Sequence, residues 1–340
     1  LSSNEPSALE GKRKALEALS HLSRSNESAD LARENKLKKE YRPEKKLESS
    51  ESARYLEKAE EYMGRGSISS ALQSVNRSLQ ADMGREDAWL LQAELLFSLG
   101  NNSRSLASVD RSLEINQSSL KAQALKGRIL LAMGRYKMAG LFLDLALRQD
   151  PENISLWMDK ALAQEKLDNY PGALKSYNVA LQEDDNNTRV LLAKGELLLK
   201  MKEYHEAVQC FSLVLEREDD AAAWRGKGLA HLALKEYPAA LECFDEALIR
   251  HPADVESILG KADVFFAQGS YNSSCQYYAR ALKIEPGDLR AWLGRGSCAI
   301  LLHDHPAALM SYEAALSLDP RNVTALAGRA DALLKMNRTK

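Results

Sequence analysis

A period of 34 residues constrains this chain more than any other feature. Similar segments begin at Ser52, Glu86, Leu120, Ile154, Thr188, Ala221, Val255 and Leu289, with one segment of 33 residues and a partial one at Val323. A fixed period of this length is the signature of a solenoid, in which each unit packs on its neighbours and the core is continuous. The repeated part, residues 52–340, is therefore expected to form one continuous body rather than two or three globular domains.

Each unit has the pattern of a helical hairpin. In residues 221–254, Trp224 and Leu232 share one face of a first helix, and Phe244 and Leu248 share one face of a second, with the spacing of amphipathic helices. The eighth place of every unit is small: Ala59, Ala93, Gly127, Ala161, Gly195, Gly228, Ala262, Gly296 and Ala330. Small residues mark the faces where helices approach closely, so we expect Gly228→Leu to disrupt packing on both sides of its unit. The predicted fold is all-α, with about eight hairpins and one terminal helix.

The order of residues across a unit resembles the tetratricopeptide repeat. The matching residues of one unit are Trp224, Gly228, Tyr237, Ala240, Phe244, Ala247 and Pro252. The resemblance extends from residue 52 to the last residue. It implies antiparallel helix pairs stacked into a right-handed superhelix, with the first helices lining the concave side. It also implies a scaffold for protein binding, without naming a partner.

If the first helices line a groove, the fifth and twelfth places of each unit should face it. These places are apolar along the chain, interrupted by Arg225 and Glu165. The candidate groove residues are Leu90, Phe97, Leu131, Met158, Leu192, Leu199, Leu232, Leu259, Phe266, Leu293 and Ile300. Such a row fits either ordinary packing between helices or a groove for an amphipathic helix of a partner protein.

A second row, at the seventh place, is basic in almost every unit. Polar or acidic residues stand eighteen positions later in most units, which predicts ion pairs within one hairpin. The predicted pairs are Lys126 with Asp144, Lys227 with Asp245 and Arg295 with Glu313. Partly exposed pairs contribute roughly 0–1 kcal/mol each, so this row is expected to specify hairpin geometry rather than to bind an anion.

Composition and motifs exclude several function classes. A net charge of -2 gives no bias toward nucleic acid, and the apolar runs fall short of the roughly 18 residues that span a membrane. The sequence has no Gly-rich phosphate loop and no nucleophile elbow. His303 and His305 flank Asp304 in an expected turn, a weak pattern for a metal site. We expect neither an enzyme nor a cofactor.

Four cysteines, Cys210, Cys243, Cys275 and Cys298, lie inside helical patterns without CxxC spacing. Buried free thiols are the favoured interpretation. Cys210 and Cys243 occupy equivalent places in neighbouring units, too far apart for a disulfide. A disulfide between Cys275 and Cys298 is left open.

Asn-x-Ser/Thr triplets, the acceptor motif for N-glycosylation, are unusually frequent. They begin at Asn26, Asn76, Asn101, Asn116, Asn153, Asn186, Asn272, Asn322 and Asn337, whereas the composition of the chain would give about 1.5 by chance. Most fall in or beside expected turns, where a glycan is tolerated. Turns also favour Asn on their own account. The excess favours an exported protein carrying Asn-linked glycans, although unpaired cysteines argue against export.

The two ends of the sequence suggest self-association. Residues 1–51 do not fit the repeat and are polar, with a leucine stripe at Leu9, Leu16, Leu19 and Leu22. They form either a flexible extension or a segment that docks on an apolar surface. The helix expected from Val323 carries Ala327, Ala330 and Leu333 on the face that a second helix should cover. A head-to-tail contact between these ends would not close and would give a fibre.

Three function classes follow. The first is an extracellular or cell-surface glycosylated scaffold that assembles with itself or binds a protein. The second is a cytoplasmic adaptor that binds a partner peptide or helix in its groove. The third, least favoured, is a non-catalytic arm of an enzyme complex.

Overall fold

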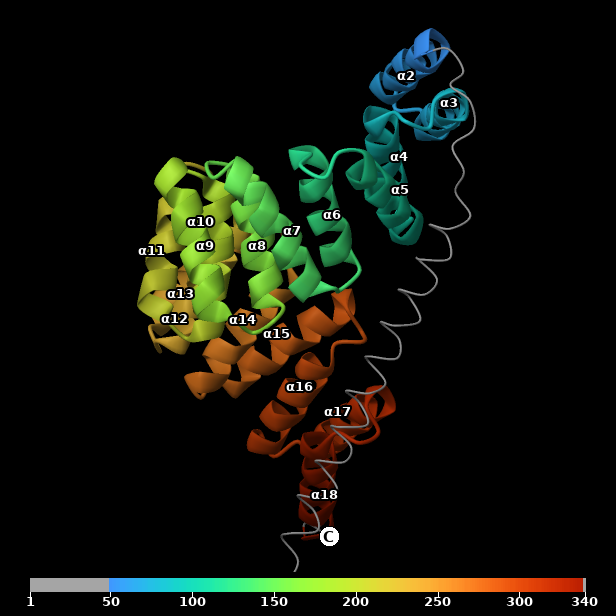
Figure 1. Cartoon of the computed structure of the whole chain (residues 1–340). Coiled ribbons are helices and arrows are strands. Elements are labelled where there is room, and N and C mark those ends of the chain that lie inside the picture. Colours follow the sequence, from blue (N-terminus) through green and yellow to red (C-terminus); the bar gives the residue numbers. More distant parts are fainter. Residues whose placement is uncertain (1–48, 339–340) are drawn as a thin grey trace, which may run out of the picture. The chain divides into compact units, whose positions relative to one another are not determined.

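The computed structural model describes residues 49–338, which form seventeen helices and no strand (Figure 1). The helices are α2 (Ser49–Gly64), α3 (Ile68–Ala81), α4 (Glu86–Ser98), α5 (Asn102–Ile115), α6 (Leu120–Ala132), α7 (Tyr136–Gln149), α8 (Ile154–Glu165), α9 (Tyr170–Glu183), α10 (Thr188–Met201), α11 (Tyr204–Leu215), α12 (Ala221–Ala233), α13 (Tyr237–Arg250), α14 (Val255–Ala267), α15 (Tyr271–Ile284), α16 (Leu289–Leu301), α17 (His305–Leu318) and α18 (Val323–Arg338). Even-numbered helices are the first helices of the repeats, and odd-numbered helices are the second. Each helix packs on the next along the chain within the two units described below, so the predicted all-α solenoid is confirmed.

The chain divides into two compact units between Asn101 and Asn102. The first contains α2, α3 and α4, around a core that includes Leu56, Val75 and Leu95. The second contains α5 to α18, whose antiparallel pairs follow one another from teal to dark red in Figure 1. The division falls between α4 and α5, two helices that the sequence places in one repeat.

The first helices begin where the sequence starts each repeat from Glu86 onward, and from α6 onward the preceding residue caps them. A side-chain oxygen of this residue accepts a backbone N–H of the first turn, which would otherwise lack a partner. The capping residues are Ser119, Asn153, Asn187, Asp220, Asp254, Asp288 and Asn322. The last place of each of these repeats thus fixes the start of the next one.

The turn between the two helices of each repeat contains one residue in the left-handed region. These residues are Gly66, Gly100, Gly134, Asp168, Lys202, Lys235, Gly269 and His303, all with φ between 56° and 76°. Glycine adopts this conformation without strain, whereas a side chain makes it less favourable. The hairpin turn is therefore a backbone requirement that four repeats meet with a residue other than glycine.

Aromatic side chains on second helices fill slots between consecutive first helices. Phe244 of α13 is fully buried and faces Gly228 of α12 and Gly260 of α14. A Cβ on Gly228 would stand 2.8 Å from Cε1 of Phe244, and one on Gly260 would be closer still. Phe211 occupies the equivalent slot between Gly195 and Gly226. The glycines are needed because dense packing leaves no room for one more carbon.

This geometry corrects the expectation for Gly228. Its nearest neighbours belong to Phe244, the second helix of its own hairpin. The contact with the preceding repeat is made two residues earlier, by Gly226 against Phe211. Packing on the two sides of α12 is thus divided between two glycines, because residues two positions apart point to opposite sides of a helix, about 200° apart.

Two of the three ion pairs predicted within one hairpin, Lys126 with Asp144 and Lys227 with Asp245, are wrong because the residues have other partners. The third, Arg295 with Glu313, is not formed, although the structure describes both residues. Lys126 pairs with Asp110 of the preceding repeat, and the Nζ–Oδ1 distance is 2.6 Å. Lys160 pairs with Asp144 at the same distance, and Lys261 pairs with Asp245. The seventh place of a first helix faces the second helix before it, sixteen residues earlier. In the first unit Gln92, the exception in the basic row, donates a hydrogen bond to Asn76 at this spacing. The row therefore links neighbouring repeats.

Candidate protein-binding surface

The first helices of the second unit line its inner side. Successive first helices contact one another, namely α6 with α8, α10 with α12, α12 with α14, α14 with α16 and α16 with α18. No pair of second helices among the described residues makes comparable contacts. Helices on the inner side of a curved stack lie closer together than those on the outer side. We call the inner surface of these first helices the first-helix face; it includes Leu162, Arg225, Asp263, Arg290 and Leu301.

The structure places the candidate groove residues mostly between helices. Leu259 is fully buried and Leu90 is 9% exposed, so neither offers a surface to a ligand. The others are half-buried: Phe97, Leu131, Met158, Leu192, Leu199, Leu232, Phe266, Leu293 and Ile300. All of these except Phe97 pack against core clusters of their own repeat or the next. Each therefore serves inter-helix packing and presents only part of its side chain.

More exposed apolar side chains lie at neighbouring places of the first helices. Leu162 of α8 is 42% exposed and Leu301 of α16 is 44% exposed. Leu162 occupies the same place as Arg128 and Asp263, which both reach toward the next first helix. Leu301 occupies the same place as Lys200, which reaches the first helix before it. These two leucines therefore stand on the first-helix face, and neither was among the groove residues predicted from the sequence.

Ion pairs cross from one first helix to the next along this face. Arg128 Nε lies 2.7 Å from Asp159 Oδ2, Lys200 Nζ lies 2.8 Å from Glu165 Oε2, and Arg225 Nη1 lies 3.0 Å from Asp254 Oδ1. The first two pairs join consecutive repeats, and the third joins α12 to the residue that caps α14. Pairs at this degree of exposure contribute roughly 0–1 kcal/mol each. Their main effect is to fix the positions of charged groups on the face.

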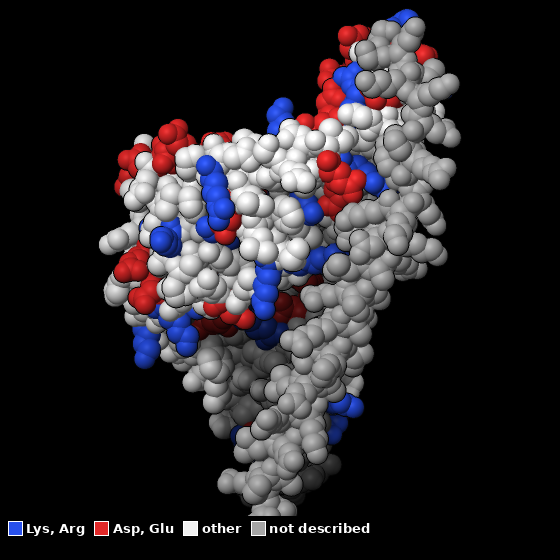
Figure 2. All heavy atoms as spheres, viewed as in Figure 1, with Lys and Arg blue, Asp and Glu red and all other residues white. Residues whose placement is uncertain are grey.

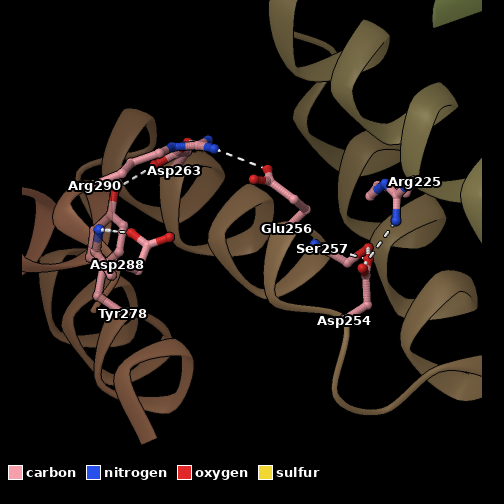
Figure 3. A network of polar contacts seen from close by, with 9 residues as sticks. Arg225, Asp254, Glu256, Ser257, Asp263, Tyr278, Asp288 and Arg290 are labelled. Carbon is pink, nitrogen blue, oxygen red and sulfur yellow. Dashed lines mark hydrogen bonds and ion pairs between the residues drawn. The ribbon is translucent and has the colours of Figure 1, made fainter. Parts of the chain in front are cut away.

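The largest network of this kind lies on α14 and α16 (Figure 3). Arg290 donates to Asp263 and to Glu256, with 3.2 Å from Nη1 to Glu256 Oε2. The hydroxyl of Tyr278, on α15, donates to Asp263. Burial first, and then the Asp263 carboxylate, raise the pKa of Tyr278, so the phenol stays protonated.

A similar group forms on α8, α9 and α10. The Tyr177 hydroxyl donates to Glu165 over 2.7 Å, and Lys200 donates to the other oxygen of that carboxylate. Burial raises the pKa of Tyr177, and the hydrogen bond to Glu165 raises the pKa of Lys200. Neither group was predicted from the sequence. A pattern in the sequence could have predicted them. Tyr177 and Tyr278 stand at the twenty-fourth place of their units, and the same units carry an acid at the twelfth place, Glu165, or at the ninth, Asp263.

Charges of both signs are interspersed on the side of the molecule seen in Figure 2, with uncharged surface between them. No large single-sign patch stands out in this view of the described residues. This distribution gives no electrostatic argument for nucleic-acid binding by this side, because such binding needs clustered basic side chains.

The four cysteines are free thiols, including Cys275 and Cys298, for which the sequence left a disulfide open. Burial raises the pKa of Cys243 and of Cys298 to about 11, and it also raises that of Cys210. Such thiols are mostly protonated at neutral pH and react slowly.

The Asn-x-Ser/Thr triplets occupy different settings. Asn101, Asn186 and Asn272 are exposed, whereas Asn116, Asn153 and Asn322 are half-buried beside helix ends. Asn153 and Asn322 cap helices, so these two have a structural reason to be Asn. Asn76 lies inside α3 and accepts a hydrogen bond from Gln92. Asn26 and the side chain of Asn337 lie outside the described residues.

Of the residues predicted to mediate head-to-tail assembly, the structure describes only those on α18. On α18, Ala327 and Ala330 are exposed, Leu333 is 43% exposed and Leu334 is 61% exposed. These residues form an uncovered apolar face on the last described helix. Leu9, Leu16, Leu19 and Leu22 lie outside the described residues.

Within residues 49–338, no helix combines the length and apolar character that a membrane span requires. In the same residues, no group of three or more His, Cys, Asp or Glu side chains is arranged to hold a metal ion. His303 provides the left-handed residue of its turn, and Asp304 caps α17.

Comparison with known sequences identifies the repeat. The sequence pattern of the tetratricopeptide repeat matches residues 56–119, 124–188, 192–255 and 259–311, well over half of the chain. The chain belongs to the tetratricopeptide repeat family. No curated protein matches the sequence. Tetratricopeptide repeat proteins act as scaffolds that bind other proteins, and this coarse role extends to the present chain.

Solved structures of tetratricopeptide repeat proteins share the fold. A tetratricopeptide repeat protein from Parabacteroides merdae has a TM-score of 0.54 at 17% identity, covering 84% of this chain and 99% of that one. The Cut9–Hcn1 assembly of the APC/C has a TM-score of 0.57 at 14% identity, covering 82% of this chain and 55% of that one. PilW, a type IV pilus biogenesis factor, has a TM-score of 0.57 at 16% identity, covering 61% of this chain and 97% of that one. At these identities the likeness concerns the fold alone.

Proposed function

We propose that the chain is a non-enzymatic scaffold that binds a segment of a partner protein on the first-helix face of its second unit. The observation that carries this proposal is that exposed leucines and ion-paired groups stand on the same first helices, Leu162 with Glu165 on α8 and Leu301 with Arg290 on α16. Leu162 and Leu301 offer apolar contacts, and the networks around Glu165 and Asp263 offer fixed hydrogen-bonding groups. Binding surfaces combine these two properties, because apolar area supplies affinity and placed polar groups supply orientation.

The geometry favours an adaptor over an enzyme. The carboxylates Glu165 and Asp263 are already paired with basic groups, and the tyrosines at Tyr177 and Tyr278 hold their protons tightly, because their pKa values are raised. A general acid or base needs a pKa near the working pH, which these phenols lack.

A variant series tests the proposal. The native protein and a Leu162→Asp/Leu301→Asp variant are used to capture partners from an extract of the source cells, with quantification by mass spectrometry. Ile249→Asp is the matched control, because Ile249 is 70% exposed on a second helix. The expected result is a set of proteins lost with the double variant and retained with the control. Equal capture by all three proteins would overturn the assignment of the face.

A second candidate function is an exported, N-glycosylated structural protein that assembles head to tail. The exposed positions of Asn101, Asn186 and Asn272 favour glycosylation, and the uncovered apolar face of α18 favours end-to-end contact. In this case the protein is extracellular or on the cell surface. The free thiols favour the adaptor and a cytoplasmic location instead.

Two measurements decide this second candidate. Intact mass of the native protein should exceed the 37.8 kDa of the polypeptide and return to it after enzymatic removal of Asn-linked sugar. Light scattering should show particles that grow with concentration and that Leu333→Asp/Leu334→Asp reduces to monomers. An unmodified mass would remove the glycoprotein, and a monomer at all concentrations would remove the fibre.

A further inference from the structure

The second helix α7 carries an apolar stripe on its solvent side that its packing does not use. Met138 is 48% exposed, Leu141 is 58% exposed and Leu145 is 38% exposed. Their spacing places them on one side of the helix, along about 10 Å of its axis. The buried side of α7, by contrast, is formed by Ala139, Leu143, Ala146 and Leu147. The helix is therefore apolar on two opposite sides.

No other second helix among the described residues has this feature. At the place of Leu141, the others carry Gln73, Ala107, Lys175, Gln209, Glu242, Gln276 and Met310. At the place of Met138, they carry Ser70, Arg104, Gly172, Glu206, Ala239, Ser273 and Ala307. Polar or small residues are the rule on this outer row, because these places face water. Three large apolar residues together on α7 thus point to a surface that is covered when the protein acts.

Basic side chains stand at both ends of the stripe and at the matching place of the next second helix. Lys137 precedes it and Arg148 follows it on α7, and Lys175 stands at the place of Leu141 on the next second helix, α9. All three are exposed, and no ion pair to any of them is formed within residues 49–338.

Acidic side chains only partly offset this charge. Asp144 on α7 is already engaged by Lys160, and Glu114 on α5 is engaged by Arg111. Glu183, the last residue of α9, is exposed and carries the opposing charge on that helix. Arg148, at the end of the stripe, is followed by the acids Asp150 and Glu152. The excess of positive charge is therefore confined to Lys137, before the stripe, and Lys175, at the place of Leu141 on α9.

From this combination we propose that the α7 stripe docks an acidic amphipathic helix of a partner protein. Three apolar anchors over two helical turns fit the i, i+3, i+7 side of such a helix. Lys137 and Lys175 fit acidic residues flanking that side. A symmetric contact between two copies through α7 is disfavoured, because it would bring the like charges of Lys137 together with those of the second copy. This surface lies on second helices and is distinct from the first-helix face.

Fluorescence anisotropy with designed peptides tests the proposal on the full chain. The probe is a labelled helical peptide of about 18 residues, with leucines at i, i+3 and i+7 and glutamates at the flanking positions. Its counterpart has lysines in place of the glutamates. The acidic peptide should bind with micromolar affinity and at least about tenfold more tightly than the lysine peptide. No binding, or equal binding of the two peptides, would overturn the proposal.

Variants locate the site. Leu141→Asp should weaken binding of the acidic peptide by about tenfold or more, and Lys175→Glu by about threefold. Met310→Asp is the matched control, since Met310 is 53% exposed at the same place on α17 and should leave binding unchanged. Circular dichroism should show that all three variants remain folded. A dimer that Leu141→Asp abolishes would instead assign the stripe to self-association and overturn the proposal.

Discussion

At the scale of single residues, close packing decides more than polarity does. Phe211 and Phe244 fit their slots only because glycines stand on both sides. The recurrence of small residues at the eighth place could be read from the sequence. Gly226 and Gly260 at the sixth place could not be selected in the same way, because that place holds Glu57 and Leu91 in other repeats and only the coordinates show which aromatic ring each glycine meets.

Gly260→Ala should destabilise the protein by about 2 kcal/mol, because the new methyl group collides with Phe244. Gly140→Ala is the control, since Gly140 lies inside α7 with open space around it. The control should be stabilising by about 0.5–1 kcal/mol, through reduced freedom of the unfolded chain. Urea unfolding measures both. Equal effects of the two substitutions on the free energy of unfolding would contradict the claim that Phe244 leaves no room for a side chain at residue 260.

The buried thiol of Cys243 predicts a pH effect. Burial raises its pKa from 9.0 to about 11, so the folded state holds the proton more tightly than the unfolded state. Its stabilising contribution is complete below pH 9 and is lost as the pH rises through about 11. Between these values, the free energy of unfolding should fall more steeply for the native protein than for Cys243→Ala. Parallel pH profiles of the two proteins would show that this thiol is not linked to folding.

At the scale of elements, ion pairs join each repeat to the next. Sequence spacing alone predicted the wrong acidic partner for the basic residues of these pairs. The basic row was visible in the sequence, but Lys126 reaches Asp110 and not Asp144. Both acids stand at the same place of their repeats, so the pattern could not distinguish them. The choice depends on how a first helix turns toward the second helix before it, which is a property of packing.

Asp245→Ala should destabilise the protein by about 1–2 kcal/mol, because Lys261 is only 7% exposed and would be left without its partner. Asp331→Ala removes a comparable pair from the surface, with Lys335, and should change stability by less than about 0.5 kcal/mol. Thermal unfolding of both variants gives the comparison. A cost as small for Asp245→Ala as for Asp331→Ala would mean that Lys261 finds another partner or water.

At the scale of the whole molecule, the periodic sequence predicts the order and pairing of helices, and function has to be sought on surfaces that the period leaves variable. Leu162, Leu301 and Leu141 interrupt rows that elsewhere hold mostly polar or small residues. The sequence-based groove residues, such as Leu259, instead follow the period and mostly serve packing. The residues that a repeat needs to fold recur, whereas a residue that a particular partner needs does not have to.

The most direct test of the central claim is site-specific photo-crosslinking in extracts of the source cells. A photoreactive phenylalanine analogue is placed at Leu162, Leu301 or Ile249, one at a time; all three native side chains are exposed apolar residues. Covalent adducts with the same partner protein are expected from Leu162 and Leu301, and none with that protein from Ile249. Adducts from Ile249 alone would contradict the claim that the first-helix face is the protein-binding surface.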